Sequence, residues 1–340
     1  MTYLLFPLTL ASMAAMGMVA WQGTLTPYLS LLVYPYVMVL LPLYDVISRR
    51  LQKPADECQT HIVHDAALAI ILPLLLMLIG AALWRLTSLE GTWQMAVSYG
   101  LAVGMASGAI GMTAAHELIH RANPAWRALG VGILVLVQYG HFRIEHIYGH
   151  HIHVGTDKDP ATARRGEGFY RFFGRVIIDS YTSAWEIETR RLTNKKQMRI
   201  SRHNRMLHYA ALQLACPVIA FGIAGWLGLL FMAVQTVVAL LLTEAVDYIQ
   251  HYGLMRTIDE TGKREPIGPH HSWNSRHAAG DWTTFNIGLH SHHHQSARTP
   301  YPELSQHPEE HEMPGNYAVM IAMAFVPPVW FAVMDKRLPH

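Results

Sequence analysis

Long apolar blocks without a charged side chain recur along the chain, and shorter polar segments separate them. Each block holds about 17 to 22 residues, the length that a helix needs to cross about 30 Å of hydrocarbon. The first block is as short as a signal peptide, but it lacks a preceding basic region and runs almost directly into the second block. The pattern predicts an all-α integral membrane bundle of about six transmembrane helices, at residues 5–21, 28–44, 66–84, 94–115, 209–224 and 226–242.

Two further apolar stretches do not fit a simple crossing. Residues 126–142 must begin and end on the same membrane face if the histidine-rich segments on either side are to meet. We therefore expect this stretch to be re-entrant or to lie flush with the membrane. Residues 317–334 contain Pro327-Pro328, which breaks a helix near its middle. We expect this second stretch to dip into the membrane rather than to span it.

Positive charge is distributed unevenly between the apolar blocks. Residues 143–208 hold thirteen Lys and Arg residues, and the segment 45–64 opens with Arg49, Arg50 and Lys53. The segments 22–27 and 222–225 hold no Lys or Arg, and residues 85–93 hold one. Because cytoplasmic loops carry the excess of positive charge, both basic segments are predicted to lie in the cytoplasm. Both termini are then predicted to lie inside as well.

The composition agrees with a membrane protein of one domain, residues 1–340. Hydrophobic residues make up 51% of the chain and charged residues 15%, against about 25% charged in an average soluble domain. The net charge of +2 is too small to indicate a nucleic-acid partner. Cys58 and Cys216 lie far apart in the sequence, so neither a disulfide framework nor a cysteine-ligated iron site is predicted.

Histidine accounts for 22 of the 340 residues, and most of it follows the predicted ends of spans. The histidine-bearing segments are about residues 116–125, 143–208 and 247–315. His116 and His120 continue the fourth block, and a spacing of four puts both imidazoles on one helical face, where they can reach a single ion. His146 and His150 repeat that spacing. The candidate metal ligands are His116, His120, His146, His150, His151, His251, His290, His293 and His294.

Nine imidazoles are too many for one ion, because zinc saturates at about four ligands. Two ions are therefore predicted. Imidazole suits zinc, copper, iron and nickel alike, so the ligand type favours iron without fixing it. The His-Glu-x-x-His pattern also matches zinc proteases, but a protease would leave six of the nine histidines unexplained. A metal transporter would place ionisable ligands near mid-membrane, whereas the predicted span interiors hold none.

The order and spacing of these motifs resemble the membrane-bound alkane monooxygenase family, within the wider group of membrane di-iron desaturases and hydroxylases. The resemblance covers residues from about 42 to 337. The motifs that carry it are HELIHR at 116–121, GHFRIEHIYGHH at 140–151, DPATARRGE at 159–167, DYIQHYGL at 247–254, HSWNS at 271–275 and LHSHHH at 289–294.

The resemblance implies that the nine histidines ligate two non-haem iron ions. Glu117 and Glu145 adjoin ligands, so they are candidates to accept a hydrogen bond from an imidazole and fix its orientation. Relatives commonly read Asn-Tyr-x-Glu-His-Tyr-Gly where this chain has Asp247 and Gln250, so Asp247 is a third candidate. Leu289 and His292 also depart from the family pattern, in which Arg and Asp stand.

The resemblance further implies an alkane 1-monooxygenase that converts the terminal carbon of medium or long-chain alkanes to a primary alcohol, R–CH₃ + O₂ + 2e⁻ + 2H⁺ → R–CH₂OH + H₂O. Rubredoxin and rubredoxin reductase would supply the electrons, since the chain has no flavin, haem or rubredoxin-like motif. A basic run within residues 190–205 is a candidate docking surface for that carrier. The implied location is a bacterial inner membrane, with the metal site on its cytoplasmic side. The alternatives are a fatty acyl desaturase or hydroxylase and a hydroxylase of alkyl-aromatic methyl groups.

Overall fold

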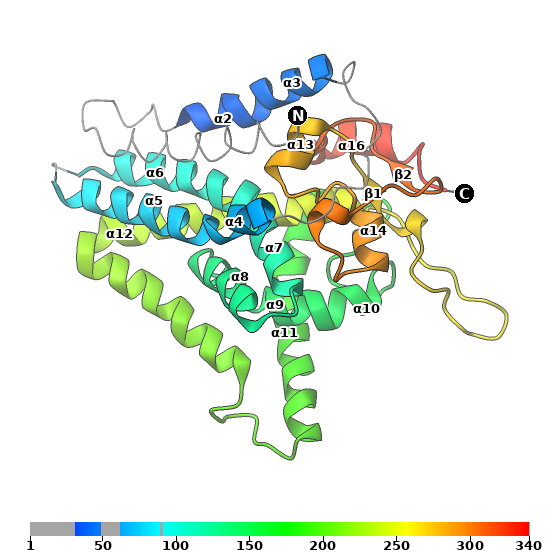
Figure 1. Ribbon diagram of the computed structural model, residues 1–340, viewed down its shortest axis with the longest axis horizontal. Helices are drawn as coiled ribbons and strands as arrows, with labels where there is room; N and C mark the ends of the chain where they lie inside the picture. Colours follow the sequence, from blue (N-terminus) through cyan, green and yellow to red (C-terminus); the bar gives the residue numbers. More distant parts are fainter. Residues whose placement is uncertain (1–30, 49–61, 89–90, 340) are drawn as a thin grey trace.

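Helices make up most of the computed structural model, which describes residues 31–48, 62–88 and 91–339 (Figure 1). The predicted first span at 5–21, the first residues of the second span and Cys58 lie outside the described residues. Within the described part of the chain the only sheet has two short strands, so the predicted helical class is confirmed.

The elements follow in chain order. The first are α2 (Val33–Pro35), η3 (Tyr36–Leu40), α3 (Leu41–Ser48), α4 (Ile62–Ala69), α5 (Ile71–Ser88), α6 (Trp93–Ala106), η5 (Ser107–Gly111) and α7 (Met112–His120). Next come α8 (Pro124–Leu136), α9 (Phe142–Glu145), η6 (His146–His150), α10 (His151–His153), α11 (Phe169–Asn194) and α12 (Arg205–His251). The last are η7 (Pro269–His271), β1 (Trp273–Asn274), α13 (Ala278–Thr283), α14 (His290–Gln295), η8 (Tyr301–Glu303), β2 (His311–Glu312), α15 (Tyr317–Ala324) and α16 (Pro327–Met334). Strands β1 and β2 pair in parallel, with Trp273 opposite His311.

Three helical stretches of the described chain are long and apolar enough to cross a membrane, namely Ile62–Thr87, Trp93–His120 and Arg205–His251. The first two contain the predicted spans 66–84 and 94–115. The third, α12, contains both 209–224 and 226–242, and Figure 1 shows its two arms meeting at an angle. The bend falls at Ala224 and Gly225, and Gly225 has a φ of 56° that favours glycine. The chain is thus an integral membrane protein. By length and composition its described residues hold three candidate spans, or four if α15 and α16 together form one, and the count of six stays a prediction.

Helix α8 and the pair α15–α16 cover the two apolar stretches that do not fit a simple crossing, and their placement in a membrane stays a prediction. Helix α8 has 13 residues, which makes it about 20 Å long and too short to cross about 30 Å of hydrocarbon. Helices α15 and α16 bend by 120° at the break before Pro327. Proline is compatible with the first turn of a helix but not with its interior, so the chain restarts a helix there.

Close contact between α6, η5 and α12 positions the histidine-bearing ends of these helices. Gly100, Gly104 and Gly108 form a small-residue stripe at intervals of four. A Cβ atom added at Gly100 would come within 2.7 Å of the Cβ atom of Val234, and one added at Gly104 within 2.7 Å of that of Val238. The two backbones can approach because the stripe has no side chains. The helices therefore run side by side toward His116 and His251 (Figure 1).

Candidate metal centre

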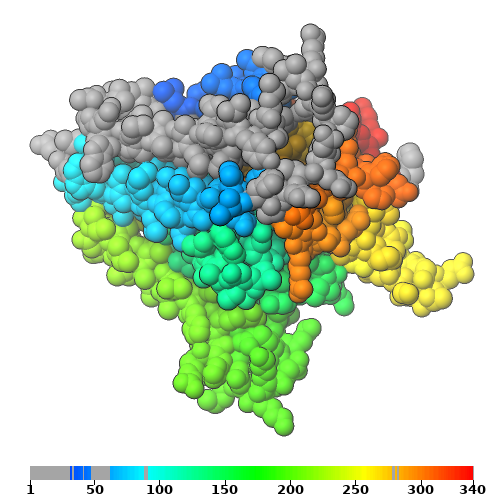
Figure 2. All heavy atoms as spheres, viewed as in Figure 1, coloured from blue at the N-terminus to red at the C-terminus, as the bar shows by residue number. Residues whose placement is uncertain are grey.

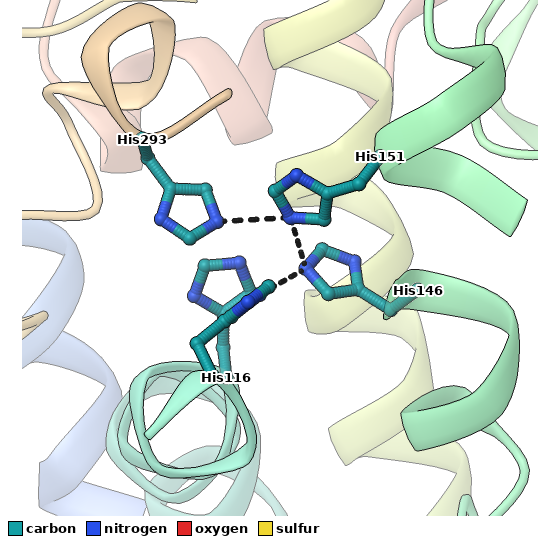
Figure 3. A group of neighbouring side chains, drawn as sticks. His116, His146, His151 and His293 are labelled. Carbon is teal, nitrogen blue, oxygen red and sulfur yellow. Dashed lines mark hydrogen bonds between the residues drawn. The ribbon is translucent and has the colours of Figure 1, made fainter. Parts of the chain in front are cut away.

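Histidines from four separate segments converge at one place in the fold. They come from the end of the α6–α7 helix, from the turn η6 and helix α10, from the end of α12, and from the short helix α14. Figure 3 shows the rings of His146, His151 and His293 turned toward one another beside His116. Segments separated by more than 140 residues thus contribute to a single cluster, since Nε2 of His293 lies 3.1 Å from Nε2 of His151.

The nine candidate ligands form two groups, and within each group the potential ligand atoms all lie within 4.8 Å of one another. The five-histidine group consists of His116, His120, His146, His151 and His293. The four-histidine group consists of His150, His251, His290 and His294, all of which are buried.

A π-helical turn decides which histidines of the second motif share a group. Residues His146–His150 form η6, in which hydrogen bonds join residues five apart rather than four. His146 therefore shares a face with His151, and His150 points to the other group. The expected i, i+4 pairing describes His116 with His120, but it does not describe His146 with His150.

The nitrogen positions in the five-histidine group fit a bound cation better than a hydrogen-bond network. Nε2 of His146 lies 3.1 Å from Nε2 of His120 and 3.1 Å from Nε2 of His151, which in turn contacts His293. An imidazole nitrogen either carries one proton or accepts one, so three contacts among four nitrogens cannot all be ordinary hydrogen bonds. Nitrogens about 2.1 Å from one ion and at right angles to each other lie about 3.0 Å apart, which matches these separations.

The four-histidine group has similar spacing. Nε2 of His290 lies 3.0 Å from Nε2 of His251 and 3.0 Å from Nε2 of His294. Nε2 of His150 is buried without a hydrogen-bond partner among the described residues, as is Nε2 of His116 in the other group. An unpaired buried nitrogen is costly unless something binds it, so both atoms are suited to a metal ion.

Asp159 holds His150 in place, a role that was not among the candidates taken from the sequence. Nδ1 of His150 lies 2.9 Å from Oδ2 of Asp159 and both side chains are almost fully buried. The Thr162 hydroxyl donates to the same oxygen at 2.6 Å. Burial lowers the pKa of His150, but the Asp159 carboxylate outweighs this effect and raises the pKa to about 9. The site therefore stabilises positive charge on this ring, and a metal cation bound at Nε2 would provide that charge as a proton does.

None of the three carboxylates named from the sequence has a hydrogen bond to a candidate ligand among the described residues. Glu117 accepts a 2.8 Å hydrogen bond from Nε of Arg121 and a 3.3 Å hydrogen bond from the backbone of Tyr301. Glu145 is buried, and burial together with the charge of Asp159 raises its pKa to about 8. Asp247 is also buried, but no hydrogen bond joins it to His251 within the part of the chain that the structure describes. The role of these three residues at the metal stays a prediction.

A third group of potential ligands, Glu265, His270 and His271, lies apart from the other two. Here the local hydrogen bonds account for the arrangement. The Gly268 N–H donates to Nδ1 of His271 at 2.8 Å, which leaves the proton of the neutral ring on Nε2, facing Glu265. A metal at that Nε2 would need the opposite tautomer, so these residues are better explained as a hydrogen-bonded turn.

Comparisons with known proteins agree with the class that this fold and site define. The family model described as fatty acid desaturase matches residues 91–324. Alkane 1-monooxygenase 1 of Pseudomonas aeruginosa is 35% identical over 87% of this chain and 80% of its own length. Alkane 1-monooxygenase of Acinetobacter baylyi is 37% identical over 70% of this chain and 58% of its own length. The xylene/toluene monooxygenase hydroxylase component of Pseudomonas putida is 31% identical over 69% of this chain and 62% of its own length.

These findings define a membrane enzyme of the desaturase and hydroxylase class with a histidine-rich metal centre. Within that class the chain belongs to the alkane 1-monooxygenase family. The resemblance read from the histidine motifs is thereby confirmed.

Proposed function

We propose that this enzyme hydroxylates the terminal carbon of medium or long-chain alkanes, with O₂ as the oxidant. The observation that carries the proposal is the convergence of nine histidines into two groups in a chain of this family. The nine residues would hold two iron ions, one in each group. When bound, those ions would supply the reduction of O₂ and the attack on an unactivated C–H bond. The protein then has to place an apolar chain beside them and exclude water.

An apolar cavity of about 100 Å³ provides a place for such a chain. Its walls include Tyr36, Met38 and Pro42, which belong to the apolar block at residues 28–44. Residues of η5, among them Ala109, also line the cavity. Small residues together with flexible or aromatic ones leave room for a narrow, unbranched substrate.

The cavity approaches the metal centre from several elements. Thr113 lines it and lies one helical turn before His116, and Ile287 lines it three residues before His290. Tyr317 also lines it, and its hydroxyl accepts a 2.7 Å hydrogen bond from Gln250, the neighbour of His251. A hydrocarbon in this cavity would therefore point one end toward the histidines. This placement supports attack at the end of the chain rather than along its length.

Electrons must come from another protein, and we propose rubredoxin, fed by rubredoxin reductase. Figure 2 shows the end of α11 and the start of α12 projecting from the rest of the molecule. Exposed basic residues on this projection include Arg190, Lys195, Lys196 and Arg202. Arg191 and Arg205 belong to the same run, but both bind the buried carboxylate of Glu188 and hold the projection together. The exposed members would attract an acidic carrier.

The basic projection also supports the proposed orientation, with the metal centre and both termini on the cytoplasmic side of a bacterial inner membrane.

Product analysis tests the proposed activity. Cells that express the chain with rubredoxin and its reductase would be fed a mixture of alkanes of different length together with toluene and xylene. We expect primary alcohols from the alkanes as the main products. Benzylic alcohols as the main products would instead favour a methyl-aromatic substrate, the function suggested by the Pseudomonas putida relative. Unsaturated fatty acids would favour the desaturase alternative.

The same assay tests the cavity. Ala109→Leu adds bulk to the cavity wall and should exclude longer alkanes while shorter ones are still converted. Ala211→Leu is a matched control, because Ala211 is exposed on α12. An unchanged length profile in Ala109→Leu would contradict the assignment of this cavity to the substrate.

A further inference from the structure

A buried hydrogen-bonded chain leads from the surface of α11 toward the four-histidine group. The Tyr139 hydroxyl donates to Oε1 of Glu244 at 2.7 Å. The same hydroxyl lies 3.3 Å from Oγ of Ser180, which lies 3.5 Å from Nε2 of His141. Tyr139, Ser180 and Glu244 are at most 4% exposed, so these polar groups lie far from bulk water.

We propose that His141, Ser180, Tyr139 and Glu244 form a proton path that supplies the metal centre. The inference rests on the proposed function, in which two protons are consumed for every O₂ as one oxygen atom enters the alcohol and the other leaves as water. Those protons must reach a metal centre whose histidines are mostly buried. A buried polar atom without a hydrogen-bond partner, such as Oε2 of Glu244 within the described part of the chain, requires an explanation, and proton delivery provides one.

The hydrogen-bond directions permit a concerted transfer. Burial lowers the pKa of His141 to about 4, so its ring is neutral and offers one donor and one acceptor nitrogen. His141 can donate to Ser180, Ser180 to Tyr139, and Tyr139 to Oε1 of Glu244. As Glu244 gains that proton on Oε1, it releases one from Oε2, which has no hydrogen-bond partner among the described residues. His141 takes up a proton on Nδ1 as it donates the one on Nε2, so every group keeps its number of protons. The hydroxyls, the Glu244 carboxyl and the His141 tautomer must then reverse before the next transfer.

Both ends of the path lie where the proposal needs them. At the outer end the His141 ring contacts Tyr181 of α11 with ring centroids 5.2 Å apart, and Tyr181 is 46% exposed. At the inner end Glu244 and His251 are seven residues apart on α12, on the same helical face and about 10 Å apart along the axis. Asp247 lies between them on that face. Asp247, Glu145 and His150 are the other titratable groups that face Glu244.

Infrared spectroscopy tests the path without relying on turnover. In protein loaded with zinc, which is redox-silent, the difference between wild type and Glu244→Gln should reveal a carboxylic acid band. The time that this band takes to shift after transfer to D₂O measures proton access to Glu244. We expect Tyr139→Phe to slow that shift by at least about 10-fold, since the phenyl ring fills the same space but cannot relay a proton. A wild-type spectrum without the acid band, or an unchanged exchange rate in Tyr139→Phe, would overturn the proposal.

Turnover of the iron-loaded protein provides the second measurement. Tyr139→Phe and Glu244→Gln should keep the metal content of wild type but form alcohol at least about 10-fold more slowly, because proton donation typically accelerates a reaction by about 10²- to 10⁴-fold. Both variants should also show a larger solvent isotope effect on the rate. Tyr248→Phe is the matched control: it removes the buried hydroxyl of Tyr248 on α12, which donates to the Glu167 carbonyl outside the path. Equal losses in the control would indicate a packing role. Absence of alcohol in wild type would contradict the proposed function while leaving the infrared result intact.

Discussion

The two histidine groups differ in the charges that surround them. The four-histidine group is buried throughout, and Asp159 binds His150 within it. Glu145 and Asp247 also face His150. In the five-histidine group His120 and His151 are only partly buried, and Glu117 is already paired with Arg121. Buried carboxylates offset the cost of moving a cation out of water. The two metal positions are thus expected to differ in affinity and in their part in proton transfer.

Removal of a histidine ligand should have the largest effect on metal content and alcohol formation, and each variant should empty only one of the two groups. We expect His150→Ala to lose metal from the four-histidine group and His293→Ala to lose it from the five-histidine group, each variant keeping about one metal ion per chain instead of about two. Both should fail to form alcohol, because the proposed reaction needs both positions. Elemental analysis of the purified proteins together with product analysis measures this.

His292→Ala is the control for His293→Ala. The His292 ring adjoins a ligand in the sequence, but its Nδ1 accepts a 2.8 Å hydrogen bond from the backbone of Ser305. Metal content and alcohol formation should therefore stay near the wild-type values. Full activity in either ligand variant, or zinc in place of iron in the wild-type protein, would contradict the di-iron proposal.

Removal of the Asp159 charge should have the second-largest effect on metal binding. Asp159→Asn keeps the shape of the side chain but removes the negative charge that supports His150. Loss of such a partner typically weakens metal binding or activity by about 10- to 100-fold, and the loss should be confined to the four-histidine group. Titration of the metal-free protein with Fe²⁺ should show one weakened site and one unchanged site.

Glu117→Gln is the matching test in the five-histidine group. Glu117 binds Arg121 rather than a histidine, so this variant should lower thermal stability and leave both metal affinities in place. A weakened five-histidine site in Glu117→Gln would show that the two groups are supported in the same way, which would remove the contrast between them.

The histidine set could be found from the sequence, whereas its division into two groups could not. Spacing indicates which residues share a face only when the helix type is known. The π-helical turn at His146–His150 shifts that face by one residue, and no residue of the motif signals it. Asp159 was missed for a related reason. It lies in a motif that the sequence analysis noted, nine residues after His150, but only the folded loop brings the two side chains together.

Apolar blocks were similarly informative about helices but not about how they connect. The sequence separates residues 209–224 from 226–242 by a short uncharged segment, and the structure joins the two helices there through two non-helical residues, Ala224 and Gly225, rather than through a longer loop. By contrast, the break at Pro327 was predictable, because proline removes a backbone hydrogen bond and fixes φ. Local backbone chemistry is therefore visible in a sequence, while the choice between a loop and a bend depends on packing.

The smallest effect is expected at Gln250, where the family resemblance implies a glutamate. Nε2 of Gln250 donates to the Tyr317 hydroxyl at 2.7 Å and to the backbone carbonyl of Ile287 at 3.2 Å. The amide thereby joins the end of α12 to the loop just before His290. Gln250→Glu would face the Ile287 carbonyl with a carboxylate, which has no donor, so we expect the free energy of unfolding to fall by about 1 to 3 kcal/mol. Metal content should change little, because the Gln250 side chain bonds to no histidine among the described residues. Thermal unfolding in detergent measures this. Gln250→Met is the control, because it loses the hydrogen bonds without adding a charge. If Gln250→Glu were more stable than Gln250→Met, this position would accept a carboxylate, and Gln250 would not set the four-histidine group apart.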